Sequence, residues 1–338
     1  MDVLRQNVGI DVAKDSFVAT LTVLLKGQIV DHIRTKTFDN SVKGFTELLR
    51  WVDKLKHQDI SVHFTMEATG VYYESLAYYL WDRESIIHVL LPNKAKKFGE
   101  SLNIKSKTDK IDSRILGQMG VERALSQWTL SSKIYRKLKT LTRERQQLIK
   151  ERTRCKNQLH AETESAEPLR TTLSRCRNLI KYLNKQIVSI ENEIKTTVKK
   201  DDFVHEKIEK ITTTPGISLI TAVVVIAETN GFQNFSSIKQ LTSFAGYDVQ
   251  IKESGKWKGK AKISKKGNSH IRHALFMPSL SVFTHSNTYN VFYNRLKKKK
   301  QNGLIAGTAV QRKILGLMYT LWKNDTEYIE NYQQNKVI

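Results

Sequence analysis

The order of strand-like and helix-like segments over residues 7–125 is the strongest constraint on the fold. Runs of apolar and β-branched residues predict strands that begin at residue 7 and continue over 17–25, 27–38, 60–67 and 85–92. One-sided apolar spacing predicts helices over 40–56, 70–83 and 108–125. Three strands followed by alternating helices and strands predict an α/β domain, in which helices cover a sheet.

Four carboxylates stand out in this region. Asp11 interrupts the first apolar strand, where a buried carboxylate is costly unless something neutralises it. Glu67 ends a second apolar strand, and Asp109 and Asp112 share one face at the start of a predicted helix. Each of them alone is more simply a cap or a surface charge. The set of four favours a site for Mg²⁺, whose oxygen ligands are carboxylates and whose charge relieves their repulsion.

The order of elements is also that of ribonuclease-H-like nuclease domains, although order by itself does not give function. Residues 129–204 differ, because they predict two long helices separated near Pro168. The second helix has an apolar heptad seam formed by Leu169, Leu173, Cys176, Ile180, Leu183, Ile187, Ile190 and Ile194. Arg145 and Arg152 fall on seam positions of the first helix. The pattern fits a helical hairpin within one chain and equally a coiled coil that also joins subunits.

Residues 205–338 predict a mostly helical region. Its first two helices flank the turn Pro215-Gly216-Ile217, which resembles a helix-hairpin-helix that presents backbone N–H groups to a phosphate. A plain helix–helix corner explains the same turn. Together the three regions predict an α/β plus α chain with parts at 1–128, 129–204 and 205–338.

A basic stretch, "ESGKWKGKAKISKKGNSHIRHAL", follows in the last region. Lysines alternate with other residues from Lys256 to Lys262, which suggests a ribbon along a phosphate backbone. Ser254 precedes a glycine among these cations, so its hydroxyl could attack a phosphodiester if a base and charge stabilisation were supplied. From spacing alone, a turn serine is the better reading.

The overall charge favours a polyanionic partner. The chain has 56 Lys and Arg against 33 Asp and Glu, a net charge of +23, which points to nucleic acid. No apolar run approaches the roughly 20 residues of a membrane-spanning helix, and the first residues lack a signal-peptide pattern. The two cysteines have no metal-ligand spacing. We therefore expect a soluble protein of the cytoplasm that does not use a membrane.

Several motifs resemble those of the DEDD transposases of bacterial insertion sequences, the bridge-RNA-guided serine recombinases. The N-terminal half has "VGIDVAKDSF", "MEATGVYYESLAYYL" and "KTDKIDSRIL", and the C-terminal half has "TTPGISLITAVVVIAE", "LTSFAGYDV" and "ESGKWKGKAKISKKGNSHIRHALF". The three carboxylate motifs in order, together with the distant serine block, are jointly specific. Two positions depart from the pattern: Tyr247 follows Ala245-Gly246 where the family continues toward a proline, and Arg114 follows Ser113.

The resemblance implies a RuvC-like N-terminal domain, a central coiled coil and a C-terminal transposase domain. It implies that Asp11, Glu67, Asp109 and Asp112 bind Mg²⁺, and that Ser254 forms a covalent phosphoserine link to DNA. It also implies donor and target DNA, a noncoding guide RNA encoded by the element, and a dimer or tetramer whose subunits combine the metal site and the serine. The enzyme would work in the bacterial cytoplasm, associated with the nucleoid when bound.

Basic side chains near two of these motifs are the predicted nucleic-acid contacts. They are Lys105, Lys107, Lys256, Lys258, Lys260, Lys265, Lys266 and Arg272. Two other functions fit the same residues. One is a Mg²⁺-dependent junction-resolving endonuclease that uses water and in which Ser254 is structural. The other is a basic scaffold that binds nucleic acid without catalysis.

Overall fold

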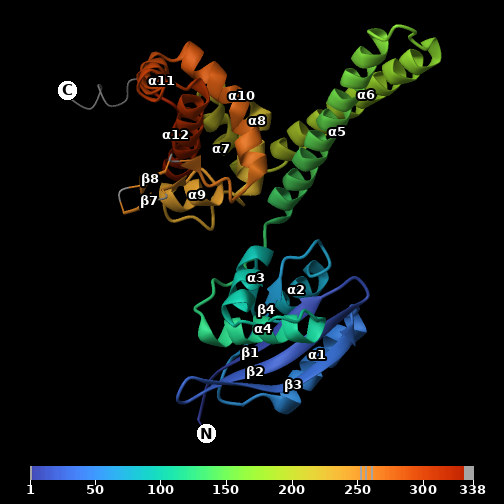
Figure 1. Ribbon diagram of the computed structural model, residues 1–338, viewed down its shortest axis with the longest axis vertical. Coiled ribbons are helices and arrows are strands. Elements are labelled where there is room, and N and C mark those ends of the chain that lie inside the picture. The colour runs from blue at the N-terminus through green and yellow to red at the C-terminus, as the bar shows by residue number, and fades with distance from the viewer. Residues whose placement is uncertain (1, 252, 256, 260–261, 331–338) are drawn as a thin grey trace. The chain divides into compact units, whose positions relative to one another are not determined.

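The computed structural model describes residues 2–251, 253–255, 257–259 and 262–330 (Figure 1). The chain divides into two compact units, Met1–Leu130 and Ser131–Ile338. The boundary follows the last segment that packs with the sheet and precedes the first long helix. The helical hairpin therefore forms one unit with the C-terminal helices.

The first unit is built on a five-stranded mixed sheet. Its strands are β1 (Val3–Val12), β2 (Ser16–Leu25), β3 (Ile29–Asp39), β4 (Val62–Glu67) and β5 (Ile86–Leu90), in the spatial order β3-β2-β1-β4-β5. The first three strands pair antiparallel, whereas β4 is parallel to both β1 and β5. This confirms the predicted α/β architecture with three strands before the alternating helices.

The helices of this unit are α1 (Val42–Leu55), α2 (Glu74–Trp81), α3 (Pro92–Ser101) and α4 (Asp109–Glu122). Helix α3 was not predicted, because only Ala95, Phe98 and Gly99 are buried in its lysine-rich sequence. Pro92 begins it, at a position where the missing N–H costs nothing.

The two faces of the sheet differ in chemistry. One face carries Val8, Ile10, Phe64 and Met66, which pack with apolar residues of α1 and α2 into a buried core. The other face lies under α4, and its contacts are polar and short. Thr20 Oγ1 lies 2.8 Å from Ser113 Oγ of α4.

Helix α4 approaches β1 as closely as two backbones can. A Cβ placed on Gly9 would lie 2.1 Å from both the Gly117 nitrogen and the Ser113 carbonyl oxygen. Gly117 in turn leaves no room for a Cβ beside Thr22, and Gly120 leaves none beside Asn7. Only glycine on both elements permits this contact, so three glycines fix where α4 lies on the sheet.

The second unit begins with a helical hairpin of α5 (Lys133–Thr163) and α6 (Arg170–Lys199). Most of the predicted seam from Cys176 to Ile194 is buried, with Ile180 half-buried, whereas Leu169 at its start is exposed. Both seam arginines find partners across the hairpin. Arg145 Nη2 lies 2.7 Å from Glu191 Oε1, and Arg152 Nη1 donates to Asn184 Oδ1 at 3.0 Å.

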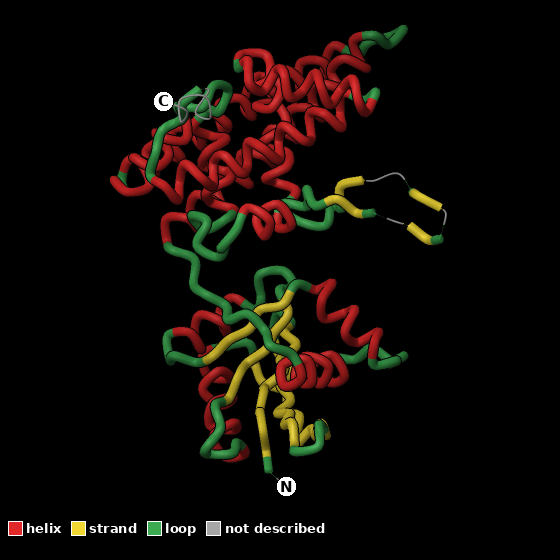
Figure 2. Tube along the Cα trace, turned by 90° about the vertical axis from the view of Figure 1, so that its left-hand side faces the viewer, coloured by secondary structure: helices red, strands yellow, loops and turns green. Residues whose placement is uncertain are grey.

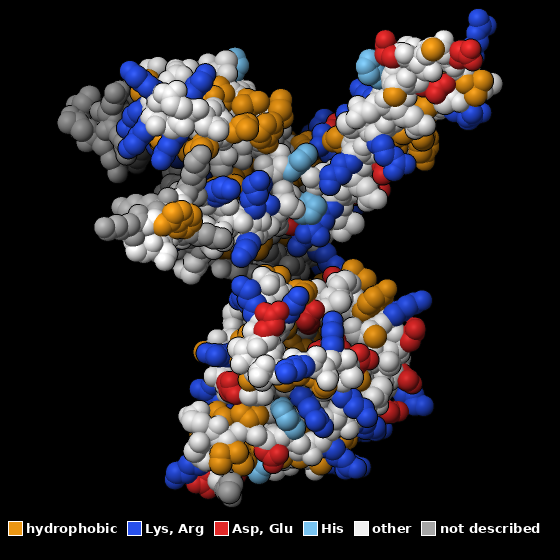
Figure 3. Space-filling view, in the orientation of Figure 1, with side chains coloured by type: hydrophobic (Ala, Val, Ile, Leu, Met, Phe, Trp, Pro, Cys, Tyr) orange, Lys and Arg blue, Asp and Glu red, His pale blue; other side chains and the backbone are white. Residues whose placement is uncertain are grey.

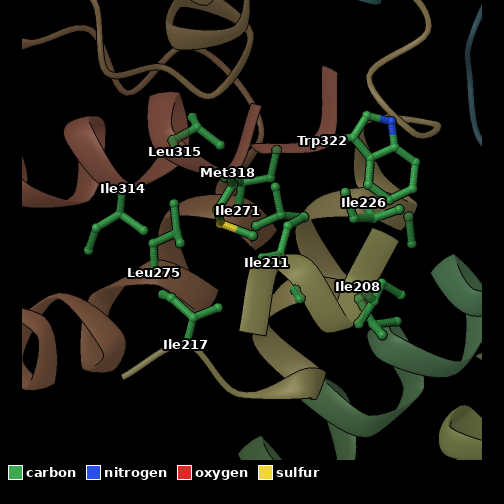
Figure 4. Close-up of a cluster of buried hydrophobic side chains, with 14 of the residues drawn as sticks. Ile208, Ile211, Ile217, Ile226, Ile271, Leu275, Ile314, Leu315, Met318 and Trp322 are labelled. Atoms are coloured by element: carbon green, nitrogen blue, oxygen red, sulfur yellow. The ribbon is translucent and has the colours of Figure 1, made fainter. Parts of the chain in front are cut away.

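The remaining helices are α7 (Asp202–Thr212), α8 (Leu219–Glu228), α9 (Ile238–Phe244), α10 (Ser269–His285), α11 (Asn287–Lys300) and α12 (Gly303–Asn324). Apolar side chains from α7, α8, α10 and α12 meet in one core, which Figure 4 shows around Ile211, Ile271 and Met318. The turn between α7 and α8 packs against α10, where a Cβ on Gly216 would meet the Ser281 side chain. None of the described helices is long and apolar enough to cross a membrane.

We expect Gly9→Ala to destabilise the first unit by about 3 kcal/mol, because a methyl group there must push α4 away from β1. Gly307→Ala is the matched control, since a Cβ there meets nothing within 4 Å and alanine favours the helix. Calorimetric melting of both variants tests this. A Gly9→Ala protein that melts like the parent would show that α4 does not pack this closely.

Candidate metal centre and nucleic-acid interface

Two of the predicted carboxylates end neighbouring parallel strands. Ile10 of β1 pairs with Met66 of β4, and both point into the apolar core. Asp11 and Glu67 are the next residues on each strand, so they point to the opposite face, toward α4. Glu67 accepts a hydrogen bond from Thr69 Oγ1 at 2.6 Å.

The other two carboxylates come from the first turn of α4. Thr108 caps this helix by accepting a hydrogen bond from the Ile111 nitrogen. Asp109 and Asp112 therefore lie at the helix start, where a negative charge is favoured by the helix dipole. Because the glycine contact sets α4 across β1, this first turn reaches the end of the strand that carries Asp11.

The charges of the four carboxylates interact. The pKa of Asp11 is raised to about 6, first by burial and then by the negative charges of Asp112, Asp109 and Glu67, while Lys107 opposes the shift. Burial also raises the pKa of Asp112, against Lys107 and together with Glu67 and Asp109. The four residues that the sequence singled out therefore lie near enough for their charges to interact.

The four side chains suit a hard divalent cation, because they offer only carboxylate oxygens as ligands. Their combined negative charge also exceeds what Lys107 can balance. Within the described residues, no three His, Cys, Asp or Glu side chains are already grouped tightly enough to hold a metal ion. Burial is the largest cause of the raised pKa of Asp11, and the three neighbouring negative charges add to it; a cation bound here would relieve both.

Ser254 lies in the second unit, on a small two-stranded ribbon. Strand β6 (Val249–Gln250) pairs with β9 (Lys262–Ile263), and β7 (Glu253–Ser254) pairs with β8 (Trp257–Lys258). Figure 2 shows these strands extending from the helices of that unit. Gly255 takes a left-handed φ of 55° just after Ser254, which puts the exposed serine at a turn.

The predicted nucleic-acid contacts fall into three groups. Lys105, Lys107, Lys265 and Lys266 are exposed. Lys256 and Lys260 lie outside the described residues, and Lys258 is described only as a backbone position in β8. Blue Lys and Arg side chains spread over the visible face of both units in Figure 3. The exposed lysines add to this broad positive surface.

Arg272 has an internal role. Its Nη1 donates to the Ala245 carbonyl at 2.7 Å and to the Gly267 carbonyl at 3.2 Å. These two carbonyls lie on either side of the basic ribbon in sequence. The half-buried guanidinium therefore ties together the two chain segments from which the ribbon emerges.

Glu228 is a buried carboxylate that our sequence analysis missed. Arg143 donates to it through Nε at 2.7 Å and Nη2 at 3.0 Å, and Asn268 Nδ2 donates at 2.7 Å. Burial alone would raise the pKa of Glu228, but these hydrogen bonds hold it below its usual value. An acid that ends the apolar run "LITAVVVIAE" was the available signal, the same anomaly that marks Asp11.

Two family models match the chain. A DEDD-type model of the IS110 group, described as a transposase, matches residues 8–168, and a model described as "Transposase IS116/IS110/IS902 family" matches residues 208–294. The chain belongs to this transposase family. The family acts on DNA, and both halves of the chain, with the carboxylates and with the serine ribbon, fall within its models.

Known proteins resemble the transposase over almost all of its length. The pilin gene-inverting proteins of Moraxella bovis and Moraxella lacunata are each 27% identical over 328 residues, covering 95% of this chain and 97% of theirs. Among solved structures, Thermus thermophilus RuvC in complex with a Holliday junction substrate is 7% identical with a TM-score of 0.26, covering 33% of this chain and 90% of that one.

We expect Asp11→Asn to stabilise the metal-free protein at pH 8 by about 1 kcal/mol. Because folding raises the pKa of Asp11 from 3.8 to about 6, the folded state holds the proton more tightly. The contribution of Asp11 to stability is therefore most favourable below pH 3.8, falls as the pH rises to about 6, and stays lower above that.

Denaturant unfolding in EDTA at pH 4 and pH 8 measures the difference. Asp15→Asn is the control, because Asp15 is exposed in the loop that follows the same strand. The gain for Asp11→Asn should shrink toward zero at pH 4. An equal effect at both pH values would mean that Asp11 carries no unfavourable charge in the fold.

Proposed function

We propose that this transposase cuts and rejoins the DNA strands of an insertion sequence with a carboxylate-bound divalent metal and a serine nucleophile. The observation that carries the proposal is geometric: Asp11 and Glu67 end neighbouring parallel strands on the face covered by α4, whose first turn bears Asp109 and Asp112. The charges of Asp112, Asp109 and Glu67 all act on Asp11, which supports a shared role for these four carboxylates.

In this proposal Asp11, Glu67, Asp109 and Asp112 hold Mg²⁺. When bound, the metal would supply positive charge at the oxygens of the phosphate that reacts. The carboxylates of β1 and β4 orient the site from the rigid sheet, and α4 supplies the other two. Lys107, whose charge already acts on Asp11 and Asp112, lies beside them and suits a neighbouring DNA phosphate.

Ser254 would act as the nucleophile. Its Oγ attacks a DNA phosphorus, a Ser–O–P bond forms, the bond to one deoxyribose oxygen breaks, and that oxygen leaves as a hydroxyl with the serine's proton. A hydroxyl of the exchanged strand then attacks the same phosphorus and releases Ser254. Exposure at a turn of a lysine-rich ribbon suits this role, because a DNA backbone can approach it closely.

The remaining parts of the proposal follow from charge and from the family. Residues 1–128 would carry the metal site, 129–204 the helical hairpin, and 205–338 the serine. The net charge of +23 suits binding to donor DNA, to target DNA and to a guide RNA encoded by the element. A dimer or tetramer would allow the serine of one subunit to serve the metal site of another.

Inversion and transposition are two outcomes of the same chemistry. The Moraxella relatives are named for inverting a pilin gene. Inversion and insertion both require strands to be cut and rejoined without loss of the phosphodiester energy, and a covalent phosphoserine conserves it. We therefore include DNA inversion among the rearrangements that this chain would catalyse.

Suicide DNA substrates, nicked so that a cut fragment diffuses away, test the proposal with Mg²⁺ and the element's RNA. We expect the parent enzyme to form a protein–DNA adduct that mass spectrometry locates at Ser254. Ser254→Ala should lose the adduct and at least about a thousandfold in recombinant product. Asp11→Asn should lose both products while keeping DNA affinity.

Ser165→Ala is the matched control, because Ser165 is an exposed serine of the same unit in the α5–α6 turn. It should react like the parent. Recombinant joints from Ser254→Ala at the parental rate would overturn the serine mechanism. Free 3′-hydroxyl and 5′-phosphate ends without an adduct would replace it with hydrolysis by water.

A further inference from the structure

A second polar site lies at the other end of the sheet in the first unit. A cavity of about 520 Å³ opens at the amino-terminal ends of β1 and β4 and is lined by Arg5, Asp59, His63, His88 and Arg123, among others. About six residues of strand separate Arg5 from Asp11, a distance of roughly 20 Å. This cavity is therefore distinct from the carboxylate site.

Two histidines in the cavity form a hydrogen-bonded pair. His88 Nδ1 lies 3.0 Å from the Ser126 carbonyl oxygen, which can only accept, so His88 carries its proton on Nδ1. His88 Nε2 then accepts from His63 Nδ1 at 2.9 Å. His63 is left with Nε2 as the atom that takes up the next proton.

Two arginines give the cavity a positive charge. Arg5 comes from β1 and donates through Nη1 to the Val121 carbonyl at 3.3 Å, which holds it near the end of α4. Arg123 follows α4 directly, with its guanidinium over the Phe98 ring. Asp59 is the one carboxylate among the described lining residues. Protonation of His63 would raise the local net charge from +1 to +2.

We propose that this cavity binds a phosphate group, carried either by a nucleic-acid strand or by a free nucleotide. A guanidinium group suits phosphate oxygens in geometry and charge, and the residues that line the cavity include two arginines. His63 Nδ1 already donates to His88, so only Nε2 can take up a proton. Once protonated, Nε2 would donate a further hydrogen bond to the bound anion. The site depends neither on the metal nor on Ser254.

The histidine pair makes the binding sensitive to pH. Burial lowers the pKa of His63, and the neighbouring His88 and Arg5 lower it further, so the empty cavity holds a neutral His63 near pH 7. An anion favours the protonated form, so binding takes up a proton. Binding should therefore tighten as the pH falls from 8 to 6. Asp59, His88, Arg5 and Arg123 are the charged or titratable groups of the cavity wall, and they set the size of this effect.

Histidine-labelled full-length protein, followed by NMR, tests the proposal with sulfate as the probe, because sulfate does not titrate in this range. Sulfate should raise the measured pKa of His63 by about one unit relative to chloride at equal ionic strength, which means about tenfold tighter binding to the protonated form. His32, a half-buried histidine on β3, should not respond.

Arg123→Gln and Arg5→Gln should each reduce the shift of His63 at least about threefold. Arg83→Gln is the control, since Arg83 is exposed and stacks on Tyr79 away from the cavity. A short single strand with hydroxyl ends identifies the source of the phosphate. A response to both strand and sulfate assigns the site to nucleic acid, and a response to sulfate alone assigns it to a free nucleotide. A His63 pKa that ignores sulfate, or responds equally in Arg123→Gln, would overturn the proposal.

Discussion

The close approach of α4 to β1 determines most of what the first unit can do. Where the helix meets the strand at Gly9 and Gly117, neither position has room for a side chain. One end of that helix delivers Asp109 and Asp112 to the strand that ends in Asp11. The other end closes the cavity with Arg123. Gly9, Gly117 and Gly120 thus position α4 so that one of its ends lies at the carboxylates and the other at the cavity, roughly 20 Å apart along the strands.

One face of the sheet packs into the apolar core, and the other carries the polar residues of the two proposed sites. The apolar face follows from strict alternation in β1 and β4, and this alternation made the strands, the α/β class and the facing helices predictable. The sequence also singled out Asp11 and Glu67, because each is a carboxylate within or at the end of an apolar strand. Alternation could not reveal the glycine contact, which joins one glycine of β1 to two glycines of α4, far away in the chain. Nor could it reveal the hydrogen bond between His63 and His88. That contact exists because β4 and β5 are neighbours in the sheet, and alternation within one strand does not specify its neighbour.

In the second unit, a partly buried ion pair between Arg143 and Glu228 joins the elements around the base of the ribbon. Glu228 accepts from Arg143 of α5 and from Asn268, and Asn268 itself caps α10 just after the basic ribbon. The helical hairpin, the apolar helix α8 and the base of the ribbon are therefore fixed together. Heptad spacing predicted the hairpin, but a contact between residues 85 apart in the chain has no local signature. Only the presence of an acid at the end of an apolar run hinted at it.

Asp11 and Glu228 show how environment decides the role of a carboxylate. Both lie at the ends of apolar segments, and burial by itself would raise the pKa of each. The pKa of Asp11 is raised, whereas that of Glu228 is lowered. Glu228 is satisfied within the chain by a guanidinium and an amide, so nothing remains for it to bind. Asp11 is half-buried and faces three further negative charges and one lysine, so its pKa rises instead. Under our proposal a bound cation would supply the compensation that Glu228 receives from within the chain.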